Sequence, residues 1–320
     1  MRVLITGGAG FIGSHLTDRL ISDGHDVTVL DNLETGRIEN LADASTSGRL
    51  TFIEGSVLDG EVVEKLAGET DFIYHLAAAV GVFNILERPL ASLMTNLRGT
   101  EIVLDAALKF SRPILVASSS EVYGKNTSDS LHEDDNRILG SPLMIRWSYS
   151  QAKAIDETLA YAYWQEKKLP TRIVRFFNTV GPRQLGAYGM VVPRFVAAAL
   201  DNEEITIYGD GNQTRCFGHV ADIIDALISV ANSEKTIGTV VNIGNDEEIS
   251  INDLAKKIIE MTDSTSKIVY LSYADAYKSG FEDMERRVPN IQRIKKLTGW
   301  VPTRNLETII RDVADHLQAN

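Results

Sequence analysis

The residues best suited to acid–base chemistry in this chain are a tyrosine and a lysine in one helical segment. Tyr149 and Lys153 stand four residues apart, which places them on the same face of a helix. An ammonium beside a phenol favours the phenolate, and lowering a tyrosine pKa from about 10 to near 7 requires roughly 4 kcal/mol. Ser119, which follows a predicted strand, is a possible hydroxyl donor to the same phenol. Such a pair is common on solvated helices, so its meaning depends on the rest of the sequence.

A glycine-rich turn near the N-terminus predicts a dinucleotide site. Residues 6–13, TGGAGFIG, satisfy both G-x-G-x-x-G and G-x-x-G-x-x-G between a strand-like and a helix-like run. Glycines let a pyrophosphate approach the backbone, and the N–H groups that begin the helix bind the anion. Asp31 closes the next predicted strand, where a carboxylate accepts hydrogen bonds from an adenosine ribose. Since Asp31 would repel a 2′-phosphate, the sequence favours NAD over NADP, although Arg37 lies nearby.

Alternating strands and helices position these groups. We expect strands at residues 2–6, 26–30, 50–54, 71–74, 113–118 and 171–176. We expect helices at residues 11–22, 61–66, 90–109 and 147–168. This alternation is typical of right-handed βαβ units and a parallel sheet covered on both faces. The predicted fold class is therefore α/β, with a Rossmann-type doubly wound sheet.

The pattern loosens after about residue 177 and predicts a smaller mixed α/β lobe. Its expected strands lie at 205–208 and 240–243, and its expected helices at 191–200, 220–232, 251–262 and 306–317. We predict an NAD-binding domain over residues 1–177 and an interleaved substrate domain over 178–320. Part of residues 206–243 is expected to return to the first domain.

Composition excludes several classes of protein. Among 320 residues, 32 Lys and Arg face 44 Asp and Glu, so the net charge is −12. A field of that sign repels nucleic acid and anionic membranes. The apolar runs are too short to span a bilayer, and no signal-peptide pattern opens the chain, so we expect a cytoplasmic protein. The scattered histidines and the single cysteine, Cys216, predict neither a metal site nor an internal disulfide.

The order of these motifs resembles the extended short-chain dehydrogenase/reductase family, the NAD-dependent sugar-nucleotide epimerases and dehydratases. The resemblance extends along nearly the whole chain, through HLAA at 75–78, RFFN at 175–178, GPR at 181–183, IYG at 207–209, QTR at 213–215 and Arg287-x-Pro289. It implies a tightly held NAD that removes a hydride from a sugar carbon and returns it. It also implies a homodimer, in which helices 90–109 and 147–168 of two copies form a four-helix bundle.

The resemblance assigns roles to particular positions. The implied catalytic residues are Ser119, Glu121, Tyr149 and Lys153. The implied NAD-binding residues are Gly7, Gly10, Phe11, Ile12, Gly13, Asp31, Asn32, Val57, Asp59, Leu76, Ala77, Ala78, Asn96, Ser118, Tyr149, Lys153 and Phe176. The implied residues for a UDP-sugar substrate are Val80, Ser120, Arg146, Asn178, Arg183, Val192, Tyr208, Arg215 and Arg287.

Three features resemble the UDP-glucuronate decarboxylase branch. Glu121 lies in SSEVYG, Arg146 stands three residues before Tyr149, and Arg215 lies in QTRCF. Tyr149 would take the 4-hydroxyl proton while NAD takes the C4 hydride, which leaves a β-keto acid that loses its C6 carboxyl. An arginine can orient that carboxylate in a bidentate fork, and Glu121 can manage the proton at C5. NADH then reduces C4, and the expected product is UDP-xylose.

Other interpretations remain open at this point. A 4-epimerase of UDP-glucuronate or UDP-glucose would use the same Tyr149 and NAD. A 4,6-dehydratase normally needs an Asp-Glu pair, and here only Glu121 follows Ser120. A regulatory protein that binds NAD without turnover would often lose the tyrosine or the lysine. At single positions, Glu121 could hold a backbone turn, and Arg146 could pair with the acidic residues 133–135.

Overall fold

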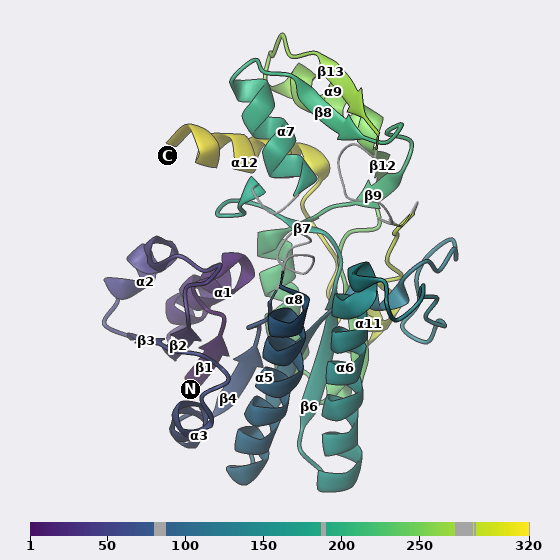
Figure 1. Cartoon of the computed structure of the whole chain (residues 1–320). Helices are drawn as coiled ribbons and strands as arrows, with labels where there is room; N and C mark the ends of the chain where they lie inside the picture. The colour runs from purple at the N-terminus through teal and green to yellow at the C-terminus, as the bar shows by residue number, and fades with distance from the viewer. Residues whose placement is uncertain (80–87, 187–189, 273–283, 285, 320) are drawn as a thin grey trace.

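The computed structural model describes residues 1–79, 88–186, 190–272, 284 and 286–319, and a parallel sheet forms their centre (Figure 1). Seven strands are arranged in the order β11-β6-β5-β4-β1-β2-β3. Their bounds are β1 Arg2–Thr6, β2 Asp26–Asp31, β3 Leu50–Glu54, β4 Phe72–His75, β5 Ile114–Ser119, β6 Thr171–Phe176 and β11 Val240–Ile243. The chain order reverses between β1 and β4, the switch point at which sheets of this kind bind ligands. The predicted α/β class and doubly wound sheet are confirmed.

Helices cover both faces of the sheet because its strands are apolar on both faces. In β1, Val3 and Ile5 pack toward one set of helices, whereas Leu4 packs toward the other. The first set contains α1 (Phe11–Ser22), α8 (Val220–Asn232) and α11 (Gln292–Thr298). The second set contains α3 (Gly60–Gly68), α5 (Pro89–Lys109) and α6 (Ser148–Lys167). Short helices also occur at Ile38–Leu41, Ala42–Ser45 (α2), Ser120–Tyr123 (η2), Ile145–Trp147 (η3) and Glu234–Thr236.

A smaller lobe lies beyond one end of the sheet, at the top of Figure 1. Its core joins α7 (Val191–Leu200), α9 (Ile251–Met261) and α12 (Leu306–Ala319) with the parallel pair β8 (Ile205–Tyr208) and β13 (Ile268–Leu271). Of residues 206–243, α8 and β11 pack with the large sheet, whereas β8 belongs to the small lobe. The domain boundary after residue 177 stays a prediction.

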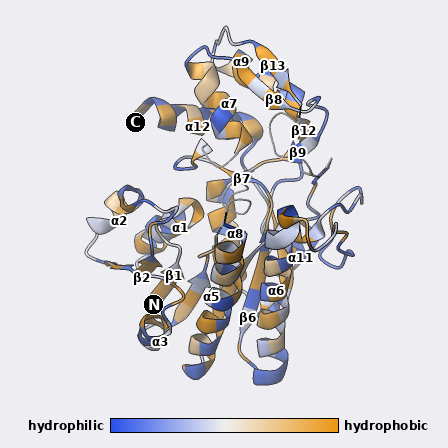
Figure 2. Cartoon of the chain, in the orientation of Figure 1, coloured by the Kyte–Doolittle hydropathy of each residue, from blue (hydrophilic) through white to orange (hydrophobic). Residues whose placement is uncertain are grey.

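The sequence pattern did not predict the shortest strands. These are β7 (Thr179–Val180), β9 (Thr214–Cys216), β10 (Gly218–His219), β12 (Glu248–Ser250) and β13. Strands of two or three residues contain too few positions to display a period, and pairing with distant segments stabilises these strands and β13. Figure 2 shows that hydrophobic residues also recur along α5 and α6, among hydrophilic ones.

Among the described residues, no helix is long and apolar enough to cross a membrane, and no group of three or more acidic, His or Cys side chains could hold a metal ion.

Candidate active site

A cavity of about 590 Å³ is lined by residues of both the sheet domain and the small lobe. It brings together the four predicted catalytic residues and most of the predicted binding residues. The predicted cofactor and substrate residues that line it are Gly7, Gly10, Phe11, Ile12, Gly13, Asp31, Asn32, Val57, Leu76, Ala77, Ala78, Ser118, Phe176, Ser120, Arg146, Asn178, Arg183, Val192, Tyr208, Arg215 and Arg287. Val80 lies outside the described residues.

The glycine turn forms a close-packed cradle at the start of α1. Gly7 has a φ of +75°, and a Cβ there would lie 2.7 Å from the backbone nitrogen of Ala77. A Cβ on Gly13 would lie 2.1 Å from the Gly7 carbonyl oxygen. The helix begins after Gly10 without a side-chain cap. Its first N–H groups are therefore not capped by a side chain, and the residues that carry them line the cavity, which fits the diphosphate of a dinucleotide.

Asp31 lies at the carboxyl end of β2, where the adenosine ribose of a dinucleotide would lie. Its carboxylate is buried and accepts hydrogen bonds from the backbone N–H groups of Ala9 and Leu33, both at 2.9 Å. These two bonds fix the orientation of the carboxyl group at the cavity that it lines. This geometry fits NAD.

Two residues predicted to bind the cofactor do not line the cavity. Asp59 caps α3, where it accepts a hydrogen bond from the N–H of Val62. Asn96 is buried on α5 and forms hydrogen bonds with both the N–H (2.9 Å) and the carbonyl (3.3 Å) of Ala79. Asn96 therefore fixes the turn after β4 that forms part of the cavity wall.

Tyr149 lies in the first turn of α6, next to the end of β5. Ser119, the last residue of β5, forms a hydrogen bond with the Tyr149 phenol. Burial raises the pKa of Tyr149 above its usual value, and the carboxylates of Glu121 and Asp156 raise it further. We had expected Lys153 to lower this pKa. Its ammonium instead donates to the Ala117 carbonyl and to Asp156 Oδ2, both at 3.0 Å.

Glu121 is held by two arginines, which we call the Glu121 clamp. Arg146 donates to both of its oxygens, with Nη1–Oε2 at 2.6 Å and Nη2–Oε1 at 3.3 Å, and Arg287 Nη2 lies 2.8 Å from Oε1. Burial would raise the pKa of Glu121, but Arg287 and Arg146 outweigh it and lower the pKa to about 2. Arg146 thus pairs with Glu121 rather than with the acidic residues 133–135. The guanidinium of Arg146 also lies 5.2 Å from the centroid of the Trp147 ring, which supports its orientation.

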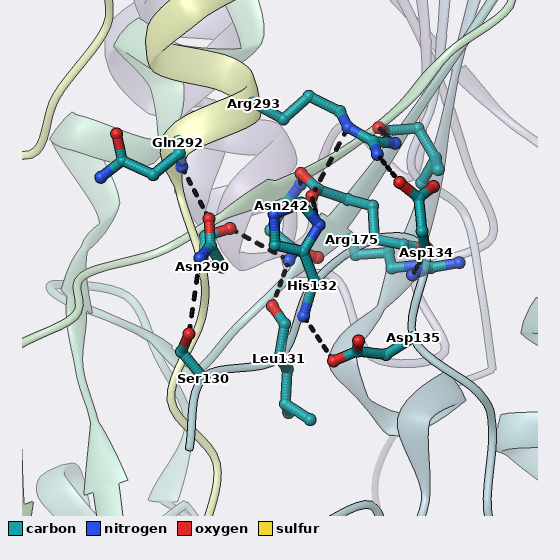
Figure 3. Close-up of polar contacts among 12 residues, drawn as sticks. Ser130, Leu131, His132, Asp134, Asp135, Arg175, Asn242, Asn290, Gln292 and Arg293 are labelled. Atoms are coloured by element: carbon teal, nitrogen blue, oxygen red, sulfur yellow. Dashed lines mark hydrogen bonds and ion pairs between the residues drawn. The ribbon is translucent and has the colours of Figure 1, made fainter. Parts of the chain in front are cut away.

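Figure 3 shows a buried polar cluster around Asn242, between the segment of residues 130–135 and the segment of residues 290–293. Glu133, with a fully buried side chain, accepts a hydrogen bond from the backbone N–H of Asn242 at 2.9 Å. The Asn242 amide donates to the carbonyls of Leu131 (2.8 Å) and Asn290 (3.2 Å). These bonds fix the segment beside Leu131 against the segment that carries Arg287.

The small lobe supplies further arginines to the cavity. Arg215 is buried and donates to the Thr214 carbonyl at 2.8 Å, whereas Arg183, with a φ of +69°, pairs with Asp18 of α1 at 2.7 Å. The sequence prediction missed Arg194, whose guanidinium lies 4.5 Å from the centroid of the Tyr208 ring and which also lines the cavity. A lone arginine in the apolar run 191–200 was the signal for it.

Comparisons with known proteins agree with this geometry. A family model described as GDP-mannose 4,6 dehydratase matches residues 4–313. The chain is 41% identical over 312 residues to a UDP-N-acetyl-alpha-D-glucosaminuronate decarboxylase of Bacillus cytotoxicus (97% of this chain, 96% of that protein). It is 40% identical over 308 residues to UDP-glucuronic acid decarboxylase 1 of Xenopus tropicalis (96% of this chain, 69% of that protein). The structure resembles that of a UDP-glucuronic acid 4-epimerase from Bacillus cereus with NAD, with a TM-score of 0.89 and 27% identity over 100% of this chain and 99% of that one.

Proposed function

The chain belongs to the extended short-chain dehydrogenase/reductase family of NAD-dependent sugar-nucleotide enzymes, and we propose that it decarboxylates a UDP-linked uronic acid. The observation that carries this proposal is the Glu121 clamp. Two guanidinium groups and a carboxylate line the same cavity as Tyr149. A neutral sugar has no negatively charged group that two buried guanidinium groups could bind, whereas a uronate has a C6 carboxylate that they can bind.

The bound NAD supplies a hydride acceptor and, later in the cycle, a hydride donor. Tyr149 takes the proton of the sugar 4-hydroxyl, and Ser119 hydrogen-bonds the same phenol. The 4-ketone then lets the C5–C6 bond break, because its electron pair moves toward the ketone oxygen as carbon dioxide leaves. A proton added at C5 and a hydride returned to C4 complete a UDP-pentose, so the net change is one carboxylate lost as CO₂ and one proton taken up.

The clamp suggests how the chain's own residues exchange partners. In the structure, Glu121 pairs with both arginines. A uronate carboxylate offers the same bidentate geometry, so it competes with Glu121 for Arg146 and Arg287. Glu121, once displaced, becomes a base whose pKa returns toward its ordinary value, which suits it to handle the proton at C5.

The test uses substrates that carry carbon-13 at C6. UDP-glucuronate and UDP-N-acetylglucosaminuronate, each with enzyme and NAD⁺, are followed by NMR and mass spectrometry. We expect labelled CO₂ and the matching UDP-pentose or its 2-acetamido counterpart from at least one of them. The Tyr149→Phe variant, which keeps the ring but lacks the base, should be about 10²–10⁴-fold slower.

A UDP-uronate 4-epimerase is the second candidate, favoured by the structural likeness to the Bacillus cereus enzyme. It would leave the label at C6 and invert C4. That outcome would contradict the proposed decarboxylation, but it would support a UDP-linked uronic acid as the substrate. If neither substrate turned over, the assigned substrate class would be wrong, and the NAD-binding fold would stand.

A further inference from the structure

Lys153 has a buried carboxylate partner that the reaction outlined above does not use. Lys153 and Asp156 lie three residues apart on α6, their side chains are 2% and 0% exposed, and Nζ lies 3.0 Å from Oδ2. The Ala117 carbonyl of β5 accepts a second hydrogen bond at 3.0 Å. An ammonium has three donors, so one N–H remains for the cavity that Lys153 lines.

The same carboxylate ends a buried polar chain that begins at the glycine turn. Thr100 of α5 hydrogen-bonds Asp156, and its hydroxyl lies 3.2 Å from His75 Nε2. His75 Nδ1 lies 2.8 Å from the hydroxyl of Thr6, the last residue of β1. Thr6, His75, Thr100 and Asp156 are at most 1% exposed. A polar chain at this depth favours one arrangement, because each group that lost its partner would be left unpaired away from water.

We propose that Asp156 is a positioning residue that fixes the Lys153 ammonium and aims it at the hydroxyl groups of bound NAD. The Asp156 carboxylate and the Ala117 carbonyl, both at 3.0 Å from Nζ, hold two of the three N–H groups and leave one direction for the third. The binding part of the proposal needs only NAD, and its kinetic part rests on the proposed function.

Asp156 also acts on the catalytic phenol. It raises the pKa of Tyr149, after the larger effects of burial and Glu121. The other titratable groups near the pair are Glu157 of α6 and His75 of β4. Burial, helped by Lys153, lowers the pKa of His75 to about 3, so this imidazole is neutral above that pH. Removing the Asp156 charge should therefore lower the pKa of Tyr149.

The first test measures NAD affinity by calorimetry on protein stripped of cofactor. Asp156→Asn should weaken NAD binding about tenfold, and it should cause no further loss in the Lys153→Met background. The matched control is Asp105→Asn on α5, which removes an exposed carboxylate that bonds Tyr163 of α6 without touching Lys153. Wild-type affinity in Asp156→Asn, or losses that simply add in the double variant, would overturn the proposal.

Folding of each variant is checked by circular dichroism. Should Asp156→Asn and the smaller Asp156→Ser both fail to fold, recovery of folding in the Lys153→Met background would support the pair, because the unpaired lysine is then gone. Failure in both backgrounds would assign Asp156 a structural role and overturn the proposal.

The second test is the pH profile of kcat/KM for the uronate. Asp156→Asn should move the limb that Tyr149 sets to lower pH by about one unit, since the phenol loses a negative neighbour that stabilises its protonated form. Lower activity with unmoved limbs would show a merely structural role and would count against the proposal. If no uronate turns over, the proposed function fails, while the NAD-binding test still decides the role of Asp156.

Discussion

At the scale of single residues, the charge of Glu121 determines how tightly Arg146 and Arg287 can bind the carboxylate of a substrate. The two guanidinium groups hold Glu121 ionised at neutral pH, with a pKa of about 2. The Glu121→Gln variant keeps the shape but removes the competing anion. We expect a KM for the uronate that is several-fold lower and a kcat that is about 10²-fold lower, because binding gains while proton handling is lost. Calorimetric binding of UDP-glucose, which lacks the C6 carboxylate, is the control and should not change. A raised KM for the uronate would contradict the exchange of partners.

The same carboxylate predicts an acid-dependent stability. Its folded pKa of about 2 lies below the ordinary value of 4.5, so the unfolded chain binds the proton first as pH falls. The stabilisation is complete above about pH 4.5, on the order of 3 kcal/mol, and is lost as pH falls toward 2. Urea unfolding of wild type and Glu121→Gln should therefore show a difference in free energy that is largest above pH 5 and shrinks toward pH 3. A difference that does not vary with pH would place the stabilisation elsewhere.

The types of the site residues were predictable from the sequence, but their partners were not. Glycine spacing and the Tyr149–Lys153 pair are local patterns, and both lie at the cavity as expected. The contact between Glu121 and Arg287 joins positions 166 residues apart, so only the fold can reveal it. Asp156 was overlooked for a different reason, since a carboxylate on a helix is usually solvated and no pattern marks this one as buried.

At the scale of elements, segments with a continuous apolar run or an apolar period were predicted almost to the residue. The strands β1, β3, β6, β8 and β11 and the helices α1, α7 and α8 have the expected bounds. The segment between η2 and η3 had no such period, because distant groups hold it rather than its own pattern. Glu133 and Asn242 fix it through bonds that cross more than 100 residues of sequence.

That arrangement makes Asn242 a test of how the clamp is supported. Asn242→Ala removes a side-chain hydrogen bond from the carbonyls of Leu131 and Asn290 and from the Tyr123 hydroxyl, although the Leu131 carbonyl keeps the N–H of Asn290. We expect a loss of about 2–3 kcal/mol in the free energy of unfolding, and a higher KM for the uronate because Arg287 lies on the adjoining segment. Urea unfolding measures the first and initial rates the second. The matched control is Asn126→Ala, whose exposed amide donates to the Asn136 carbonyl and whose removal should cost well under half as much. Equal losses of unfolding free energy in the two variants would show that the buried cluster stabilises the protein no more than an ordinary surface hydrogen bond.

At the scale of the whole molecule, the sheet domain and the small lobe meet at the cavity through a few polar contacts. Arg183 of the lobe side pairs with Asp18 of α1, and His219, which caps α8, bonds Asp312 of α12 at 2.9 Å. Each domain keeps a separate apolar core. The two domains therefore contribute different residues to the cavity. The sheet domain contributes the glycine turn, Ser119 and Tyr149, and the small lobe contributes further arginines.

The last prediction concerns the outer surface of α5 and α6, which lie side by side across one face of the sheet (Figure 1). Leu90 on α5 and Ile155 and Tyr161 on α6 are 71%, 47% and 43% exposed, so both helices carry large apolar side chains on the outer surface of the single chain. A helix that is apolar around its girth is normally buried on two sides, and the sheet covers only one. We therefore predict that two copies pair through α5 and α6.

Light scattering at micromolar concentration should give twice the mass of the 35.2 kDa chain, and Ile155→Asp should shift the population toward the monomer. The matched control is Ile38→Asp, an exposed apolar residue away from these helices, which should leave the mass unchanged. A monomer mass for the wild-type chain would rule the pairing out.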